Sequence, residues 1–268
     1  MPSKELESAK NIVKSAGKLI LELYGKTTIE YKQDQSIVTK ADLKSERLIR
    51  GNLYKDFPND LILGEELGLD SNKNQEQTSN RMWVVDPLDG TTNFSMRNPF
   101  FCVTMSLVQD DEPILGVTYF PFQDELFWAE KGEGAFLNGK QICVKEDLEP
   151  ETCVLTFCHG RDSNSIETVG KLFTHFKPIN TKFRQMGAAA LELAYVACGR
   201  TGTFFMPGVN LWDVSAGVVL VREAHGKVTN LVGKEFTIQS TTLLASTQTL
   251  HPWIITQVEQ ALKRENEF

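Results

Sequence analysis

The feature that most constrains this chain is an apolar strand that runs directly into two carboxylates. Residues 82–85 have the composition of a buried strand, and Asp86 and Asp89 follow it, with Pro87 fixing the turn between them. Two ionised carboxylates repel each other and lose hydration on burial, so this position needs a cation or several hydrogen-bond donors. A hard divalent cation meets both needs. The alternative is a plain turn, because Asp-Pro and Asp-Gly pairs are common in turns.

The residues after Asp89 are expected to bind an anion. Gly90, Thr91 and Thr92 are predicted to begin a helix. The first N–H groups of a helix have no partner inside it, and together with the helix dipole they attract phosphate. The sequence therefore places candidate metal ligands and a candidate phosphate site next to each other.

Further acidic residues lie beside predicted apolar elements. Glu65 follows a short predicted strand at residues 61–63. Asp213 precedes a helical run at residues 214–220 and, taken alone, is interpreted as its N-cap. Asp42 fits a capping box at the start of another predicted helix.

Hydrophobic periodicity predicts a mixed chain in which antiparallel strands come first and strands alternate with helices later. Apolar residues at three- and four-residue spacing predict helices at 12–24, 40–54, 165–176, 188–197, 214–224 and 252–264. Short apolar runs predict strands at 61–63, 82–85, 102–108, 116–120, 125–129 and 154–157. Residues 68–81 are polar without periodicity and are expected to form a loop. The later alternation is typical of an α/β layer.

Composition limits the partners and the compartment. A net charge of -7 over 268 residues argues against nucleic acid or an anionic membrane as the main partner, because both are bound through clustered Lys and Arg. The sequence has no apolar run of about 18 residues, the length that a membrane span needs. The five cysteines form no CxxC pair and are interpreted as reduced. We therefore expect a cytoplasmic protein.

Three motifs follow one another along the chain. They are Gly64-Glu65-Glu66, then Asp86-Pro87-Leu88-Asp89-Gly90-Thr91-Thr92-Asn93-Phe94, then Trp212-Asp213-Val214-Ser215-Ala216-Gly217. In this order they resemble the inositol monophosphatase family of metal-dependent, lithium-sensitive phosphatases, and the resemblance covers nearly the whole chain. It implies an α/β (α+β) fold, namely a layered αβαβα sandwich, and a homodimer. It also implies a single phosphatase domain with subdomains at about residues 1–145 and 146–268.

Carried over by position, the resemblance implies a Mg²⁺ site with two or three ions. One ion would be bound by Glu65, Asp86 and the backbone carbonyl of Leu88. A second ion would be bound by Asp86, Asp89 and Asp213. Ligation by oxygen alone is what magnesium prefers.

The resemblance also assigns the groups that act on the substrate. Gly90 and Thr91 would contact the phosphate. Glu65 and Thr91, with Asp42 close by, would orient a metal-activated water for attack on phosphorus. This role for Asp42 replaces the capping box as the main expectation.

The substrate wall is placed by the same resemblance at Gly187, Ala188 and Met206. Inositol-selective members usually carry Glu where this chain has Met206, and often a hydroxyl residue where it has Ala188. Loss of a buried acceptor for a substrate hydroxyl lowers discrimination between substrates without removing the hydrolytic groups. The expected substrate is therefore an inositol-1-phosphate-like or other sugar phosphate.

Alternative functions remain open. Within the fold they are fructose 1,6-bisphosphatase, histidinol-phosphatase and 3'-phosphoadenosine 5'-phosphate phosphatase activities. Relatives that act on the last substrate usually carry Lys-Glu after Asp-Gly-Thr, whereas this chain has Thr92-Asn93. An alternative of another class is a regulatory binding protein of the transcription machinery. The acidic charge of the chain disfavours direct contact with RNA.

Overall fold

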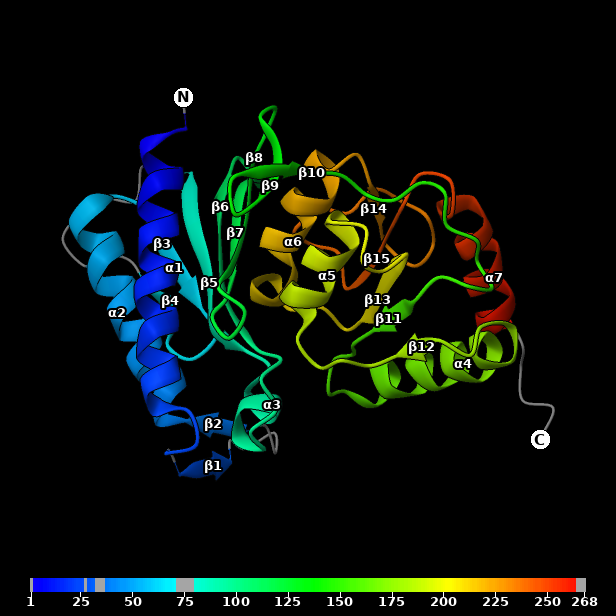
Figure 1. The fold of residues 1–268 in the computed structure, drawn as a ribbon, viewed down its shortest axis with the longest axis horizontal. Coiled ribbons are helices and arrows are strands. Elements are labelled where there is room, and N and C mark those ends of the chain that lie inside the picture. The colour runs from blue at the N-terminus through cyan, green and yellow to red at the C-terminus, as the bar shows by residue number, and fades with distance from the viewer. Residues whose placement is uncertain (1, 27, 32–36, 71–79, 264–268) are drawn as a thin grey trace.

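The computed structural model describes residues 2–26, 28–31, 37–70 and 80–263, whose elements stack in five layers (Figure 1). In order, the layers are an outer helix pair, an eight-stranded sheet, an inner helix pair, a five-stranded sheet and a second outer helix pair. The αβαβα sandwich expected from the sequence is confirmed.

The eight-stranded sheet is built by the N-terminal half of the chain. Its strands are β3 (Leu61–Gly64), β4 (Gly68–Asp70), β5 (Arg81–Asp89), β6 (Cys102–Gln109), β7 (Glu112–Phe120), β8 (Glu125–Glu130), β9 (Gly134–Leu137) and β10 (Lys140–Ile142). They lie in the order β10-β9-β8-β7-β6-β5-β3-β4, and β3 pairs with β5 in parallel. From β5 to β10 each strand pairs antiparallel with the next, as predicted. The outer helices α1 (Lys4–Leu23) and α2 (Lys40–Asp56) cover one face.

The predicted loop at residues 68–81 is wrong at both ends. Gly68–Asp70 forms β4, which pairs antiparallel with β3, and Arg81 begins β5. A three-residue strand at a sheet edge is too short to show alternation of apolar and polar residues, so periodicity could not reveal it. Residues 71–79 lie outside the described residues.

The inner helices α5 (Ala189–Ala197) and α6 (Leu211–Glu223) lie between the two sheets. Every residue of α5 except Tyr195 is buried, as expected for a helix covered on all sides. α6 packs directly against β7, where a Cβ at Gly116 would lie 2.4 Å from the carbonyl oxygen of Ala216. Glycine at this position therefore permits the helix to approach the sheet closely.

The five-stranded sheet is mixed and closes the C-terminal half. Its strands are β11 (Leu155–Phe157), β12 (Phe183–Arg184), β13 (Thr203–Pro207), β14 (Lys227–Thr229) and β15 (Thr242–Ser246), in the order β12-β11-β13-β15-β14. β11 runs parallel to β12 and β13, while β15 is antiparallel to β13 and β14. The outer helices α4 (Ser163–Ile179) and α7 (His251–Lys263) cover its far face.

The helix starts matter most for the site. α2 begins with the predicted capping box at Thr39, the last residue of β2 (Ile37–Thr39), which pairs with β1 (Ile29–Tyr31). The N-cap of α6 is Asn210, so the interpretation of Asp213 as an N-cap is wrong, and Asp213 lies in the first turn. α3 (Thr91–Ser95) is a single short turn that follows Gly90. None of the helices among the described residues has the length and apolar composition needed to cross a membrane.

The close contact between α6 and β7 gives a prediction about stability. Gly116→Ala should lower the free energy of unfolding by about 1–3 kcal/mol, because its methyl group overlaps backbone that cannot move easily. Gly51→Ala on α2 is the matched control, since a Cβ there meets no atom within 4 Å and alanine favours a helix. Urea unfolding measures both, and equal stability of Gly116→Ala and wild type would contradict the packing described.

Candidate active site

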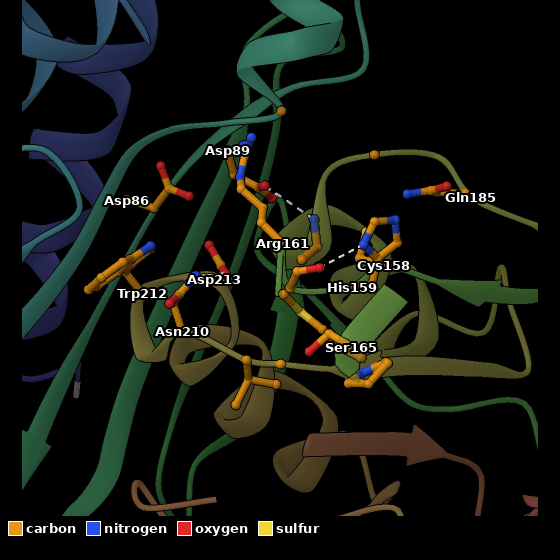
Figure 2. Close-up of a pocket in the computed structure, with 18 of the residues that line it drawn as sticks. Asp86, Asp89, Cys158, His159, Arg161, Ser165, Gln185, Asn210, Trp212 and Asp213 are labelled. Carbon is orange, nitrogen blue, oxygen red and sulfur yellow. Dashed lines mark hydrogen bonds between the residues drawn. The ribbon is translucent and has the colours of Figure 1, made fainter. Parts of the chain in front are cut away.

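An open cavity of ≈ 1130 Å³ collects most of the residues singled out in the sequence. It lies where the end of β5, the start of α3, the first turn of α6 and the end of β13 meet. The expected site residues that line it are Glu65, Asp86, Leu88, Asp89, Gly90, Thr91, Gly187, Met206 and Asp213. Asp42 and Ala188 are fully buried behind this lining. Figure 2 shows Asp86, Asp89 and Asp213 around one space, so an acid on α6 faces the turn at the end of β5.

β5 changes its pairing where the two aspartates emerge. Asp86 pairs with Thr104 of β6 and Asp89 with Cys102, so one extra residue is inserted between them on β5. A bulge of this kind bends a strand and redirects its side chains. The turn is stiffened by Asp86 itself, whose Oδ1 accepts the N–H of Leu88 at 2.9 Å. The two carboxylates can therefore face the same cavity although three positions separate them.

Asp42 combines both roles that the sequence allowed. Its Oδ2 accepts the N–H of Thr39 at 2.8 Å and the Thr39 hydroxyl at 2.7 Å, which completes the capping box of α2. Its Oδ1 lies 2.9 Å from Thr91 Oγ1, and that hydroxyl lies 3.0 Å from the carbonyl oxygen of Leu88. Burial raises the pKa of Asp42, although hydrogen bonds from both threonines oppose the shift. Asp42 thus contacts the cavity lining through Thr91.

Asp89 is held by a helix that sequence reasoning did not connect to it. Its Oδ1 accepts the N–H of Ala189 at 3.2 Å and its Oδ2 the N–H of Ala190 at 2.8 Å. Ala188, the N-cap of α5, has no side chain that could accept these bonds, so Asp89 supplies the cap from β5. Burial nevertheless raises the pKa of Asp89 to about 7.

Burial and mutual repulsion also raise the pKa values of the other aspartates. The pKa of Asp86 lies well above its usual range, because of burial first and then the charges of Glu65, Asp89 and Asp213. Burial and the charge of Asp89 raise the pKa of Asp213 to about 7, although a hydrogen bond from Asn210 opposes the shift. Without a cation, the cluster holds its negative charge at a cost in free energy.

The donor set fits a hard divalent cation. Glu65, Asp86, Asp89 and Asp213, with the carbonyl of Leu88, offer oxygen atoms alone. Among the described residues, no three His, Cys, Asp or Glu side chains are already gathered into a finished metal site. The acidic side chains would therefore close around an ion when it binds, which their repulsion favours.

The wall opposite the acidic cluster is fixed from both sides. The Asn93 side chain, in α3, donates to the carbonyl oxygens of Phe100 and Met186 at 2.8 Å each. On the other side, Glu192 Oε1 accepts the N–H groups of Met186 at 3.2 Å and Gly187 at 2.9 Å. Burial raises the pKa of Glu192 to about 7. Sequence reasoning missed Glu192, although an acid inside an otherwise apolar helix is a usable signal.

The far wall of the cavity carries two residues that the sequence gave no reason to select. His159 and Arg161 follow β11 and line the cavity, and Figure 2 shows both near the acidic cluster. The charge of Arg161 lowers the pKa of Asp213, against the larger effect of burial. The sequence interpretation of the histidines as surface or structural groups holds for His251, whose ring nitrogens bond Thr229 and Ser246, but His159 faces the cavity.

A layered α/β fold with a carboxylate-lined cavity beside a β-bulge and a short helix start defines a phosphoric monoester hydrolase. Residues 1–263 match the model of the inositol monophosphatase family. A Thermotoga maritima protein described as fructose-1,6-bisphosphatase/inositol-1-monophosphatase is 32% identical over 260 residues, which cover 96% of this chain and 97% of that protein. The Nus factor SuhB of Xylella fastidiosa is 36% identical over 230 residues, which cover 83% of this chain and 80% of that protein.

The solved structures agree with the sequence relatives. An IMPase of Thermotoga maritima superposes on this chain with a TM-score of 0.88 and 31% identity, covering 97% of this chain and 99% of the other. The chain therefore belongs to the inositol monophosphatase family, which is metal-dependent in general.

The raised pKa of Asp213 predicts how stability changes with pH in metal-free buffer. A native pKa of about 7 against an ordinary 3.8 means that folding is favoured by the protonated form below pH 4, and that this stability is lost as the pH rises through 7. Asp213→Asn should therefore gain about 1 kcal/mol or more in unfolding free energy, relative to wild type, between pH 4 and 7.5. Urea unfolding with EDTA tests this, and an equal difference at both pH values would count against it.

Proposed function

We propose that this protein is a Mg²⁺-dependent phosphatase that hydrolyses the phosphate monoester of a small molecule in the cavity at the end of β5. The observation that carries the proposal is the convergence of Glu65, Asp86, Asp89 and Asp213 on this cavity from the turn after β3, from β5 and from α6. Acids so far apart in sequence are buried together at a cost, and a bound cation would remove that cost.

The proposed ligand sets follow the expected assignments, with two or three ions in the site. Glu65, Asp86 and the Leu88 carbonyl would hold one ion, and Asp86, Asp89 and Asp213 a second. When bound, Mg²⁺ supplies a water of lowered pKa and charge stabilisation for the leaving oxygen.

The surrounding residues would orient the reactants. The Thr91 hydroxyl, placed 2.9 Å from Asp42 Oδ1, would with Glu65 orient the attacking water, since Asp42 can accept the threonine proton and leave the hydroxyl oxygen as an acceptor. Gly90 and Thr91 would direct their backbone N–H groups at the phosphate. The φ of 89° at Gly90 and a Cβ position only 3.0 Å from the Phe100 carbonyl oxygen explain why glycine stands there.

The proposed substrate is an inositol-1-phosphate-like or other sugar phosphate, with Gly187 and Met206 as the wall that meets the sugar. Met206 offers no acceptor for a ring hydroxyl, so the site should discriminate weakly among polyols. A second candidate is a sugar bisphosphate such as fructose 1,6-bisphosphate. Arg161 favours it, because a guanidinium in the same cavity can pair with a second phosphate. Asn93 is occupied in holding Met186, which leaves the nucleotide and histidinol phosphates without a specific supporting contact.

Further properties are proposed on weaker support. The protein would be one domain in two subdomains divided near residue 145, since β10 ends at Ile142 and β11 begins at Leu155. Its five free cysteines fit a reducing cytoplasm. A homodimer and lithium inhibition follow from the family resemblance. No nucleic acid partner is expected at a net charge of -7. A regulatory role in transcription is the alternative of another class, which the name of the Xylella relative favours.

Removal of a single carboxylate should abolish most of the activity. Asp86→Asn and Asp213→Asn are each expected to lower kcat by at least about a hundredfold at saturating Mg²⁺ while the fold is kept, because each removes a ligand charge but no volume. Asp162→Asn is the matched control. Asp162 also lines the cavity, but it caps α4 through the Ser165 N–H, and Asn can replace it there. Steady-state kinetics with wild-type turnover in either test variant would refute the assignment.

A panel of phosphate esters should separate the two substrate candidates. Arg161→Gln is expected to lower kcat/KM for fructose 1,6-bisphosphate by about tenfold or more, through loss of a charge-assisted hydrogen bond, and to change that for inositol 1-phosphate little. Equal effects on both esters would show that Arg161 does not read a second phosphate.

A further inference from the structure

A buried ion pair on α2 lies directly behind the turn that carries Glu65. Glu46 is fully buried although it bears a carboxylate, and Arg50, one helical turn later, is 5% exposed. Arg50 Nε donates to Glu46 Oε1 at 2.8 Å, and Arg50 Nη2 lies 2.8 Å from the same oxygen. The catalytic groups proposed above include neither residue.

The pair binds the backbone of the turn between β3 and β4. Glu46 Oε2 accepts the N–H of Glu66 at 2.8 Å, and Oε1 accepts the N–H of Leu67 at 3.2 Å. Arg50 Nη2 donates to the carbonyl oxygen of Gly68, the first residue of β4. Three consecutive residues after Glu65 are thus held by one ion pair.

The glycine that opens the Gly64-Glu65-Glu66 motif is explained by the same contact. A Cβ at Gly64 would lie 2.0 Å from Oε1 and 2.5 Å from Cδ of Glu46. These distances are far below any real Cβ contact, so the carboxylate can lie against the end of β3 because residue 64 has no side chain. On the other side, the N–H of Glu65 donates to the carbonyl oxygen of Val85 on β5 at 3.2 Å.

Stability alone is a poor explanation of this arrangement. Replacement of a buried ion pair by apolar residues of similar volume is often neutral or stabilising. A carboxylate that accepts backbone N–H groups, in contrast, fixes a turn in a way that no apolar side chain can. The contacts of Glu46 fix the turn that presents Glu65 to the cavity.

We propose that Glu46 is a positioning residue for Glu65, with Arg50 as its buried counter-charge. The inference rests on the proposed function, in which Glu65 is a metal ligand. Val85 holds the backbone of Glu65 from β5, and Glu46 holds the next two residues from α2, so the Glu65 carboxylate starts from a fixed backbone. Residues that orient metal ligands from behind typically change metal affinity or activity by about 10–100-fold when mutated.

The test uses Glu46→Gln, which keeps the volume but loses the charge and the second acceptor. Mn²⁺ is the probe, and its binding to metal-free protein is measured by electron paramagnetic resonance alongside kcat and KM for inositol 1-phosphate. We expect the Kd for Mn²⁺ to rise about tenfold or more and kcat to fall, with KM little changed. Glu223→Gln is the matched control, because Glu223 accepts the N–H groups of Gly132 and Gly134 in the same manner away from the cavity. It should bind Mn²⁺ as wild type does.

Two further variants make every outcome decisive. Glu65→Gln tests the proposed function: if it leaves the Kd for Mn²⁺ unchanged, Glu65 is not a ligand. If Glu65→Gln weakens binding but Glu46→Gln does not, the positioning role alone is wrong. Should Glu46→Gln fail to fold, Gly64→Ala reports instead, since its methyl group must displace the Glu46 carboxylate. A folded Gly64→Ala protein with wild-type Mn²⁺ affinity would also end the proposal.

Discussion

The repulsion between carboxylates buried at the end of β5 is the constraint on which the rest of the site depends. Asp86 and Asp89 could have been separated by the alternation of a regular strand, but an extra residue between them turns both toward one cavity, where Asp213 joins them. Close, poorly hydrated negative charges are expensive, and the raised pKa values of all three aspartates record that expense. A site of this kind is stable only when something positive is supplied, which is the property that makes it suitable for metal-assisted hydrolysis.

One helix supports this arrangement from behind. Asp42, Ser45 and Glu46 lie on one face of α2, at positions i, i+3 and i+4, and all three are fully buried. Asp42 binds the Thr91 hydroxyl, Ser45 donates to the carbonyl oxygen of Pro87 at 2.9 Å, and Glu46 holds the turn after Glu65. A single polar stripe on α2 therefore contacts three segments that line the cavity. The inner helix α5 acts from the other side, where its first N–H groups bind Asp89.

The sequence predicted the layered fold, the antiparallel meander and the acids that meet at the cavity, because these depend on local periodicity and on motifs. It did not reveal contacts whose partners are distant in sequence and ordinary in type. The bonds from Ala189 and Ala190 to Asp89 involve backbone atoms, which carry no residue signal. Asp213 was misread as an N-cap because the helix begins three residues earlier, at Asn210 and Leu211. β4 was missed because it pairs with β3 at a sheet edge through three residues.

Metal location tests the central claim most directly. Crystals grown with Mn²⁺ in place of Mg²⁺ would show the ion through its anomalous scattering. The account predicts a peak between Asp86 and Asp213, within bonding distance of both, that disappears in crystals of Asp213→Asn. A well-ordered cavity without such a peak, or a peak bound elsewhere on the chain, would contradict it.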